Sequence, residues 1–232
     1  MAEGTVMNRD NRFADTGAEA TTVEGVTGGR SDLGMNQQTL TDALREFRAA
    51  EIPLQGRRAA GIAIPVGVHR GESVVCLTKR SASLRSHPGQ YAFPGGRVDS
   101  GETAAEAAVR ELSEELGIQT TPEHVLGRLD DYATKSGYVM SPFVVWIGDR
   151  VEAIRPNPGE VAHVFLVTPD EVDVDPLFVS DPAVEEPIVQ WPFRGALVHA
   201  PTAAVLHQFR EVVLHGRHTR VAHFGQPVFA WK

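Results

Sequence analysis

Apolar residues follow two periods along the chain, and these periods predict a mixture of strands and helices. Two apolar runs, residues 59–68 and 73–78, are separated by the polar turn His-Arg-Gly-Glu and predict a β-hairpin or two neighbouring strands. Leucines recur at helical spacing from about residue 38, which predicts a first helix there. Residues 103–116 place another apolar stripe along one side of a helix.

The remainder of the chain continues this mixture. Residues 125–133 and 138–147 flank a Lys-Ser-Gly turn and predict a second hairpin. Further elements are predicted at 160–167 (a strand), 187–199 (short strands) and 202–215 (a helix that Gly216 ends). Several antiparallel pairs and a mid-chain helix indicate an α+β fold, in which helices cover the outside of a mixed β-sheet.

Composition divides the chain into a tail and one domain. Residues 1–35 are rich in Gly, Thr, Ala and acidic residues and show neither period, so they predict a disordered N-terminal tail. Residues 36–232 are expected to form a single domain. The 30 acidic residues exceed the 22 Lys and Arg residues, and the resulting net charge of −8 argues against a nucleic-acid partner. A single cysteine, Cys76, and the absence of a long apolar run favour a cytoplasmic protein without a membrane partner.

Three glutamates share one side of the helix predicted at 103–116. With Glu111 at 0°, Glu115 lies at about +40° and Glu114 at about −60° around the helix axis. Like charges at these spacings repel one another, and the helix dipole disfavours anions near its C-terminal end. A solvated acidic face commonly explains such a run, but a bound cation would also offset the repulsion. Carboxylate oxygens suit the hard ions Mg²⁺ and Mn²⁺.

The residues around this helix match a known motif. They occupy every fixed position of the pattern G-x5-E-x7-R-E-U-x-E-E-x-G-U, where U is a bulky apolar residue. The matching residues are Gly96, Glu102, Arg110, Glu111, Leu112, Glu114, Glu115, Gly117 and Ile118. The segment therefore resembles the Nudix box. The resemblance implies a Nudix hydrolase, an α/β/α sandwich around a mixed β-sheet, that cleaves a nucleoside diphosphate linked to another group.

The segment before the box carries a second resemblance. Residues 77–96, LTKRSASLRSHPGQYAFPGG, are similar to the signature of the coenzyme A pyrophosphatase subgroup, roughly L-L-T-x-R-S-x3-R-x3-G-x3-F-P-G-G. Cys76 replaces the leading Leu, and Tyr91 stands at a usually aliphatic position. The similarity covers about 57–167 and includes the stretches SGY (136–138), PFV (142–144) and NPGEV (157–161).

This subgroup implies coenzyme A or acyl-CoA as the small-molecule partner, cleaved to 3′,5′-ADP and (acyl-)4′-phosphopantetheine. The basic residues Lys79, Arg80, Arg85 and His87 immediately precede the acidic helix. They are expected to contact the substrate phosphates, including the 3′-phosphate of coenzyme A. The alternative is that they end a strand and cap a loop in solvent.

The Nudix resemblance also implies roles for the acidic residues. Glu111 and Glu115 are expected to bind Mg²⁺ or Mn²⁺, which would neutralise the diphosphate and activate a water. Glu114 is expected to be a further ligand or the general base, and the Gly95 carbonyl an additional ligand. Glu160, on a Pro/Gly-rich turn, is a second candidate for base or ligand.

Two further box residues are expected to support the metal site. Arg110 would orient a glutamate, and Glu102 would lie outside the direct ligands of the metal. Other functions of the same fold stay open. The substrate could be ADP-ribose, a dinucleotide or an oxidised nucleotide, or the domain could be a non-catalytic nucleotide-sensing module.

Histidines and aromatic residues near the C-terminus give weaker signals. His215, His218 and His223 match no standard zinc spacing, so a helix end followed by a loop is the favoured interpretation. Trp191 and Phe193, with Trp231, suit core or dimer-interface packing better than an adenine or acyl pocket, which leaves a homodimer open.

Overall fold

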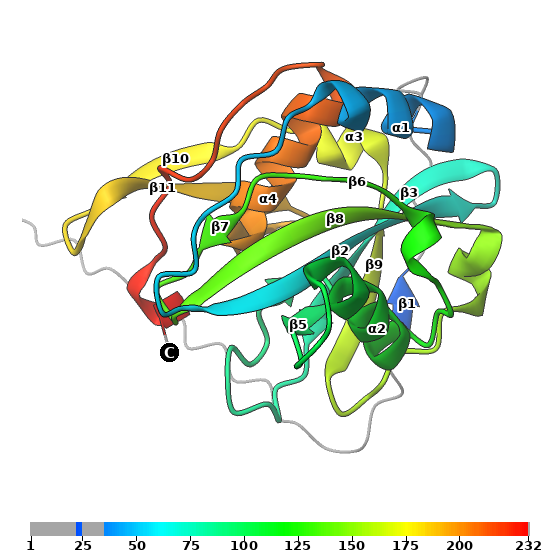
Figure 1. The fold of residues 1–232 in the computed structure, drawn as a ribbon, viewed down its shortest axis with the longest axis horizontal. Helices are drawn as coiled ribbons and strands as arrows, with labels where there is room; N and C mark the ends of the chain where they lie inside the picture. Colours follow the sequence, from blue (N-terminus) through cyan, green and yellow to red (C-terminus); the bar gives the residue numbers. More distant parts are fainter. Residues whose placement is uncertain (1–21, 25–34, 232) are drawn as a thin grey trace, which may run out of the picture.

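The computed structural model describes residues 22–24 and 35–231, which are built around a mixed nine-stranded sheet (Figure 1). The main strand order is β1-β9-β3-β2-β8-β6. These strands are β1 (Thr22–Glu24), β9 (Val161–Val167), β3 (Glu72–Arg80), β2 (Arg58–His69), β8 (Tyr138–Gly148) and β6 (Val125–Arg128). Three short strands join them: β4 (Tyr91–Ala92) on β3, β5 (Gly95–Arg97) on β2 and β7 (Tyr132–Ala133) on β8. The β2–β8 pair is parallel and the β2–β3 pair antiparallel, which confirms a mixed sheet.

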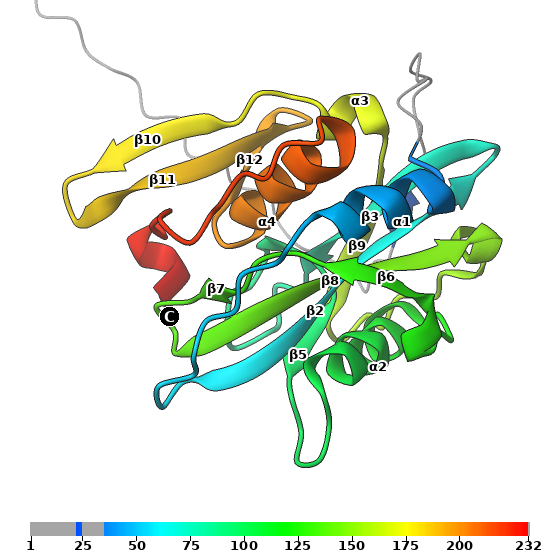
Figure 2. The same cartoon turned by 45° about the horizontal axis from the view of Figure 1, so that its top comes forward.

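Helices cover both faces of this sheet (Figure 2). The helix α2 (Ala104–Leu116) lies on one face, and α1 (Gln37–Glu46) and α4 (Thr202–Phe209) lie on the other. A second, antiparallel sheet lies on the α4 side and consists of β10 (Leu177–Asp181), β11 (Val184–Phe193) and β12 (Ala196–His199). Shorter elements are α3 (Pro169–Val172), a π-helical turn (Arg210–Leu214) and 3-10 turns at Pro122–His124, Asp149–Ala153 and Val228–Trp231. The predicted α+β fold, an α/β/α sandwich with a mixed sheet, is confirmed.

Alternation along β2 supplies both cores of the sandwich. Ile62 and Ile64 are buried in the cluster that includes α1 and α4, whereas Ala63 is buried in the cluster around α2. Gly61 brings α2 close to the sheet, since an added Cβ would lie 2.0 Å from the Ala104 carbonyl oxygen. The small residues of β2 therefore set how closely the box helix approaches the strands.

The box helix begins and ends at the residues that capping chemistry favours. The Thr103 side chain accepts from the Glu106 N–H at 3.2 Å, and the Glu106 carboxylate accepts from the Thr103 N–H at 2.8 Å. At the other end Gly117 has a φ of 70°, the left-handed conformation that closes a helix. The helix predicted at 103–116 is confirmed as α2, with Thr103 as its N-cap.

The C-terminal region differs from its prediction in one detail. The helix predicted at 202–215 is α4 followed by a π-helical turn, which ends before Gly216 at a φ of 61°. A π-helical turn contains one residue more than an α-helical turn, and the spacing of apolar residues does not distinguish the two. The pattern therefore predicted one uninterrupted helix. The short strands predicted within 187–199 are confirmed as parts of β11 and β12.

Most of the predicted N-terminal tail, residues 1–35, lies outside the described residues. Within that range, Thr22–Glu24 pairs in parallel with His163–Phe165 of β9, and Met35 is buried. The remaining 1–21 and 25–34 are not described, so a disordered tail stays a prediction. No helix in the described ranges is long and apolar enough to cross a membrane.

The aromatic residues and histidines near the C-terminus that the structure describes make packing and hydrogen-bond contacts. The rings of Trp191 and Phe193 stack at 5.4 Å and are buried in the core, whereas the side chain of Trp231 lies outside the described part. His215 contacts Asp173, and the His218 ring packs edge-on against Phe47. Both histidines therefore have partners within the described fold.

Candidate active site

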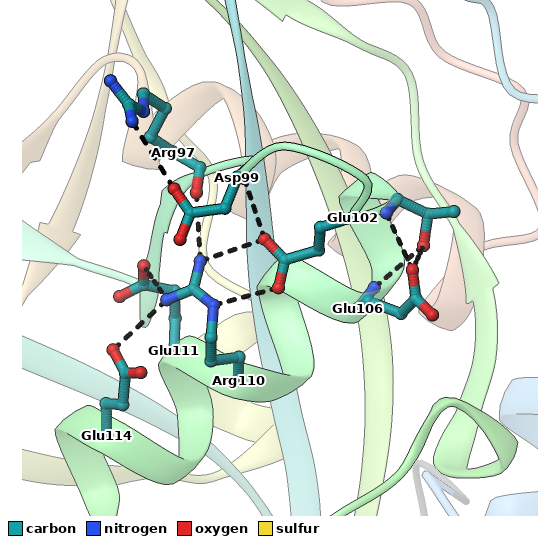
Figure 3. Close-up of polar contacts among 8 residues, drawn as sticks. Arg97, Asp99, Glu102, Glu106, Arg110, Glu111 and Glu114 are labelled. Carbon is teal, nitrogen blue, oxygen red and sulfur yellow. Dashed lines mark hydrogen bonds and ion pairs between the residues drawn. The ribbon is translucent and has the colours of Figure 1, made fainter.

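One arginine holds most of the box carboxylates together (Figure 3). Arg110 donates from Nε to Glu102 Oε1 at 2.9 Å and from Nη1 to Glu111 Oε1 at 2.7 Å. Its Nη1 also donates to Glu114 Oε2 at 3.2 Å, and its Nη2 to the Arg97 carbonyl at 3.0 Å. The guanidinium thus fixes three carboxylates relative to strand β5. Its hydrogen bonds to Glu102 also lower the pKa of that carboxyl below its ordinary value.

Glu115 is the most enclosed carboxylate of the box. Its side chain is only 6% exposed, and Oε1 accepts from the Gly95 N–H at 3.3 Å. Burial raises the pKa of Glu115 to about 7, because the Gly95 N–H and the charge of Arg80 offset only part of the lost hydration. The charges of Glu111 and Glu160 raise this pKa further.

Glu111 lies directly against strand β5. An added Cβ on Gly96 would lie 2.0 Å from Glu111 Oε1, so any larger residue at position 96 would displace this carboxylate. Burial raises the pKa of Glu111 above its ordinary value, and hydrogen bonding to Arg110 reverses only part of that rise. Glu111 and Glu115 therefore form a pair of partly desolvated carboxylates beneath β5.

This pair fits a hard divalent cation. Two adjacent carboxylates with raised pKa values gain most from a nearby positive charge, and their oxygens are the donors that Mg²⁺ and Mn²⁺ prefer. Within the described residues, no three His, Cys, Asp or Glu side chains already converge as a metal site. Arg110 explains part of this, because it binds oxygens of Glu102, Glu111 and Glu114.

Glu160 is remote in sequence but approaches the box in space. It lies just before β9, and its carbonyl accepts from the Ser81 N–H at 2.8 Å, which ties its turn to the end of β3. Its charge raises the pKa values of both Glu111 and Glu115. The structure therefore brings this predicted residue close to the carboxylate pair.

A cavity of about 630 Å³ borders strand β5. Gly95 and Gly96 line it, together with parts of β2 and β8, and Thr202 and Val205 of α4 contribute from the facing element. Two predicted basic residues lie in its wall, Arg80 and His87. Burial and the charge of Arg80 lower the pKa of His87 below its ordinary value.

Arg80 links the cavity to the carboxylates. Its buried Nε atom has no hydrogen-bond partner among the described residues, and its charge acts on the pKa of Glu115. The other two predicted basic residues do not line the cavity. Lys79 Nζ lies 5.8 Å from the centre of the Tyr91 ring, and Arg85 is exposed on the loop before β4.

Sequence reasoning missed several cavity residues. Arg58, Arg97, Thr202 and Gln226 all line the cavity. Alternation along β2 could have found Arg58, because it shares a face with Ala60. No local pattern marks Thr202 or Gln226, which the fold brings in from beyond the second sheet.

Comparisons with known proteins identify the family. A family model described as the NUDIX domain matches residues 57–191. An uncharacterized Nudix hydrolase NudL of Photorhabdus laumondii is 32% identical over 185 residues, which cover 75% of this chain and 98% of that protein. Nudix hydrolase 3 of Caenorhabditis elegans is 38% identical over 117 residues. These residues make up 49% of this chain and 49% of the Caenorhabditis protein, so the match spans about half the length of that relative.

The solved Nudix hydrolase RenU of M. smegmatis is 23% identical, with a TM-score of 0.44 over 68% of this chain and 86% of that one. The family model spans more than half of the chain and includes the whole box. The chain belongs to the Nudix hydrolase family.

Proposed function

We propose that the protein hydrolyses the diphosphate bond of coenzyme A or acyl-CoA, with Mg²⁺ or Mn²⁺ as cofactor, to 3′,5′-ADP and (acyl-)4′-phosphopantetheine. One observation carries the proposal: the Arg80 side chain, with its buried unpartnered Nε, lies in a cavity wall beside the enclosed carboxylate Glu115. A fixed cation next to a metal-binding carboxylate suits a diphosphate, which needs both. The similarity of residues 77–96 to the coenzyme A signature selects this substrate among diphosphates.

In this proposal Glu111 and Glu115 hold the metal, with Glu114 and the Gly95 carbonyl as further oxygen donors. When bound, the divalent ion neutralises charge on the diphosphate and lowers the pKa of a coordinated water. Arg110 keeps Glu111 in place, and Glu102 holds Arg110 from the other side without touching the metal. These contacts fix the carboxylates before the substrate arrives.

The proton of the attacking water needs an acceptor. Glu114 and Glu160 are both proposed for this role, because Glu114 extends from the same helix side at 55% side-chain exposure and Glu160 approaches the pair from β9. The water oxygen forms a bond to phosphorus, the bridging P–O bond breaks, and the base takes the proton. Positioning and charge neutralisation supply most of the rate.

Arg80 and His87 are proposed to bind the substrate phosphates from the cavity wall. Lys79 and Arg85 belong to the same predicted basic cluster but do not line the cavity. They would attract the substrate phosphates only through their charge. The hydrolase reaction is favoured over a non-catalytic sensing module, because all the box carboxylates are present. ADP-ribose or another nucleoside diphosphate derivative is the alternative substrate.

A substrate panel tests the proposal. The purified protein with Mg²⁺ or Mn²⁺ is expected to cleave coenzyme A and acyl-CoA, with products identified by mass spectrometry, and EDTA is expected to stop the reaction. Cleavage of ADP-ribose with coenzyme A left intact would overturn the substrate. Binding of the panel without any product would favour the sensing module.

Two substitutions test the base. The Glu114→Gln or the Glu160→Gln variant, whichever removes the base, is expected to lose about 10²- to 10⁴-fold in kcat while its metal requirement stays the same. Full activity of both variants would contradict this part of the site.

A further inference from the structure

One arginine in the cavity lining, Arg58, is stacked on an aromatic ring. Arg58 begins β2 and lies beside Tyr138, which begins β8, in parallel register. The guanidinium carbon of Arg58 lies 4.2 Å from the centre of the Tyr138 ring. Both residues line the cavity, and so does Ser136 in the turn before β8.

This arginine is prepared to bind an anion. A guanidinium that rests on an aromatic face keeps its N–H donors free at its edge, and the ring limits its motion. No carboxylate pairs with Arg58 among the described residues, whereas Arg97, which also lines the cavity, is paired with Asp99 at 3.5 Å. The Ser136 hydroxyl adds a neutral donor beside it.

The stacked pair is separate from the diphosphate site. Gly95, which contacts Glu115, pairs with Ile62, and Arg58 lies four residues earlier on the same strand. At about 3.3 Å per residue this is about 13 Å along β2. A single cavity of about 630 Å³ includes both places, so one elongated ligand can reach both.

We propose that Arg58, positioned by Tyr138 and assisted by Ser136, binds a phosphomonoester of the substrate at the end of the cavity remote from the carboxylates. This inference rests on the proposed function, in which the 3′-phosphate of coenzyme A is that group. A phosphomonoester is dianionic and accepts several hydrogen bonds, which matches the free edge of a guanidinium. The subsite makes the enzyme favour diphosphates that carry an additional phosphate.

Coenzyme A and dephospho-coenzyme A form a matched pair of substrates for the test, because only the first has the 3′-phosphate. The Arg58→Gln variant is expected to lose about 10- to 100-fold in kcat/KM for coenzyme A, mainly through KM, and less than about 2-fold for dephospho-coenzyme A. Arg57→Gln is the control, since Arg57 is exposed and does not line the cavity. Tyr138→Phe is expected to keep the discrimination, because the ring face and not the hydroxyl supports Arg58.

Equal losses for both substrates, or no loss for either, would overturn the subsite. If the wild-type protein cleaves neither substrate, the proposed function fails, and calorimetry with 3′,5′-ADP and 5′-AMP, which differ only by the 3′-phosphate, then tests the subsite by itself. A wild-type preference for 3′,5′-ADP that Arg58→Gln removes supports the subsite. Equal binding of the two nucleotides by the wild-type protein contradicts it. Thermal unfolding of each variant shows whether the fold is retained.

Discussion

Gly96 and the Glu111 carboxylate are in such close contact that a methyl group on Gly96 would lie 2.0 Å from Oε1. Strand β5 thereby limits the position of the carboxylate, while Arg110 holds it by a hydrogen bond of 2.7 Å. The position of Glu111 is therefore set by backbone and by charge together.

The Gly96→Ala variant is expected to fold and to lose activity. The added methyl group displaces the flexible end of Glu111, and a shift of about 1 Å in a catalytic site costs about 100-fold in rate. Gly61→Ala is the matched comparison, because Gly61 pairs with Gly96 across the sheet. Its methyl group would instead lie 2.0 Å from the Ala104 carbonyl, so this variant is expected to lose stability by about 3 kcal/mol.

Thermal unfolding and initial rates together check this pair. The Gly96→Ala variant is expected to unfold within a few degrees of the wild-type protein. Wild-type rates in the same variant would contradict the close contact.

Glu115→Gln is expected to remove metal-dependent activity by at least about 100-fold without loss of stability. The carboxylate is enclosed and costs hydration free energy in the metal-free protein, and a neutral amide of the same shape avoids that cost. Glu106→Gln is the control, since this residue of the same helix bonds Thr103 and a glutamine keeps the capping box. Mg²⁺ is expected to raise the unfolding temperature of the wild-type protein but not that of Glu115→Gln.

Arg110→Lys is expected to weaken metal binding by about 10- to 100-fold, because a single ammonium group cannot replace a planar fork that binds three carboxylates. The Mg²⁺ concentration at half-maximal rate measures this change. Arg45→Lys, an exposed arginine on α1, is expected to leave that concentration unchanged. An unaltered Mg²⁺ requirement in Arg110→Lys would mean that the carboxylates hold their positions without it.

Glu211 is expected to make stability depend on pH. Burial alone would raise its pKa, but hydrogen bonds from Arg217 and the nearby charges of Arg217, His207 and Arg210 outweigh burial and lower it. A carboxylate with a lowered pKa stabilises the folded state above its unfolded pKa, and this stabilisation is lost as pH falls through the folded value. Glu211→Gln should therefore cost about 3 kcal/mol at pH 7, and the difference from the wild-type protein should shrink in acid.

Denaturant unfolding at pH 7 and at about pH 3 measures this difference in the free energy of unfolding. Glu185→Gln is the control, because Glu185 is exposed. A destabilisation of Glu211→Gln that stays constant across this range would contradict the ion-pair explanation.

The sequence predicts which box residues lie together, because the box is local. Glu111, Glu114 and Glu115 lie on one helix, so spacing alone places them together, and the capping residues mark where that helix begins. The strands were predictable for a similar reason, since the apolar runs of β2 and β3 are visible over short windows.

The cavity lining was less predictable because it depends on which face a strand residue occupies. Lys79 and Arg80 are neighbours on β3, yet only Arg80 lines the cavity. Arg58 becomes a cavity residue only once β8 brings Tyr138 alongside it. Predicting such pairings requires the order of the strands in the sheet, and no single sequence segment reveals that order.

The hydrogen bond between Tyr132 and Phe224 has a consequence for folding during synthesis of the chain. The buried Tyr132 hydroxyl donates to the Phe224 carbonyl at 2.7 Å across 92 positions of chain, and Gln226 beside it donates to the Ala133 carbonyl. A ribosome completes the carboxylate helix early, but the residues that close the cavity come last. A growing chain that has reached residue 200 already carries the box carboxylates, and it still lacks the cavity-lining residues Thr202, Val205 and Gln226.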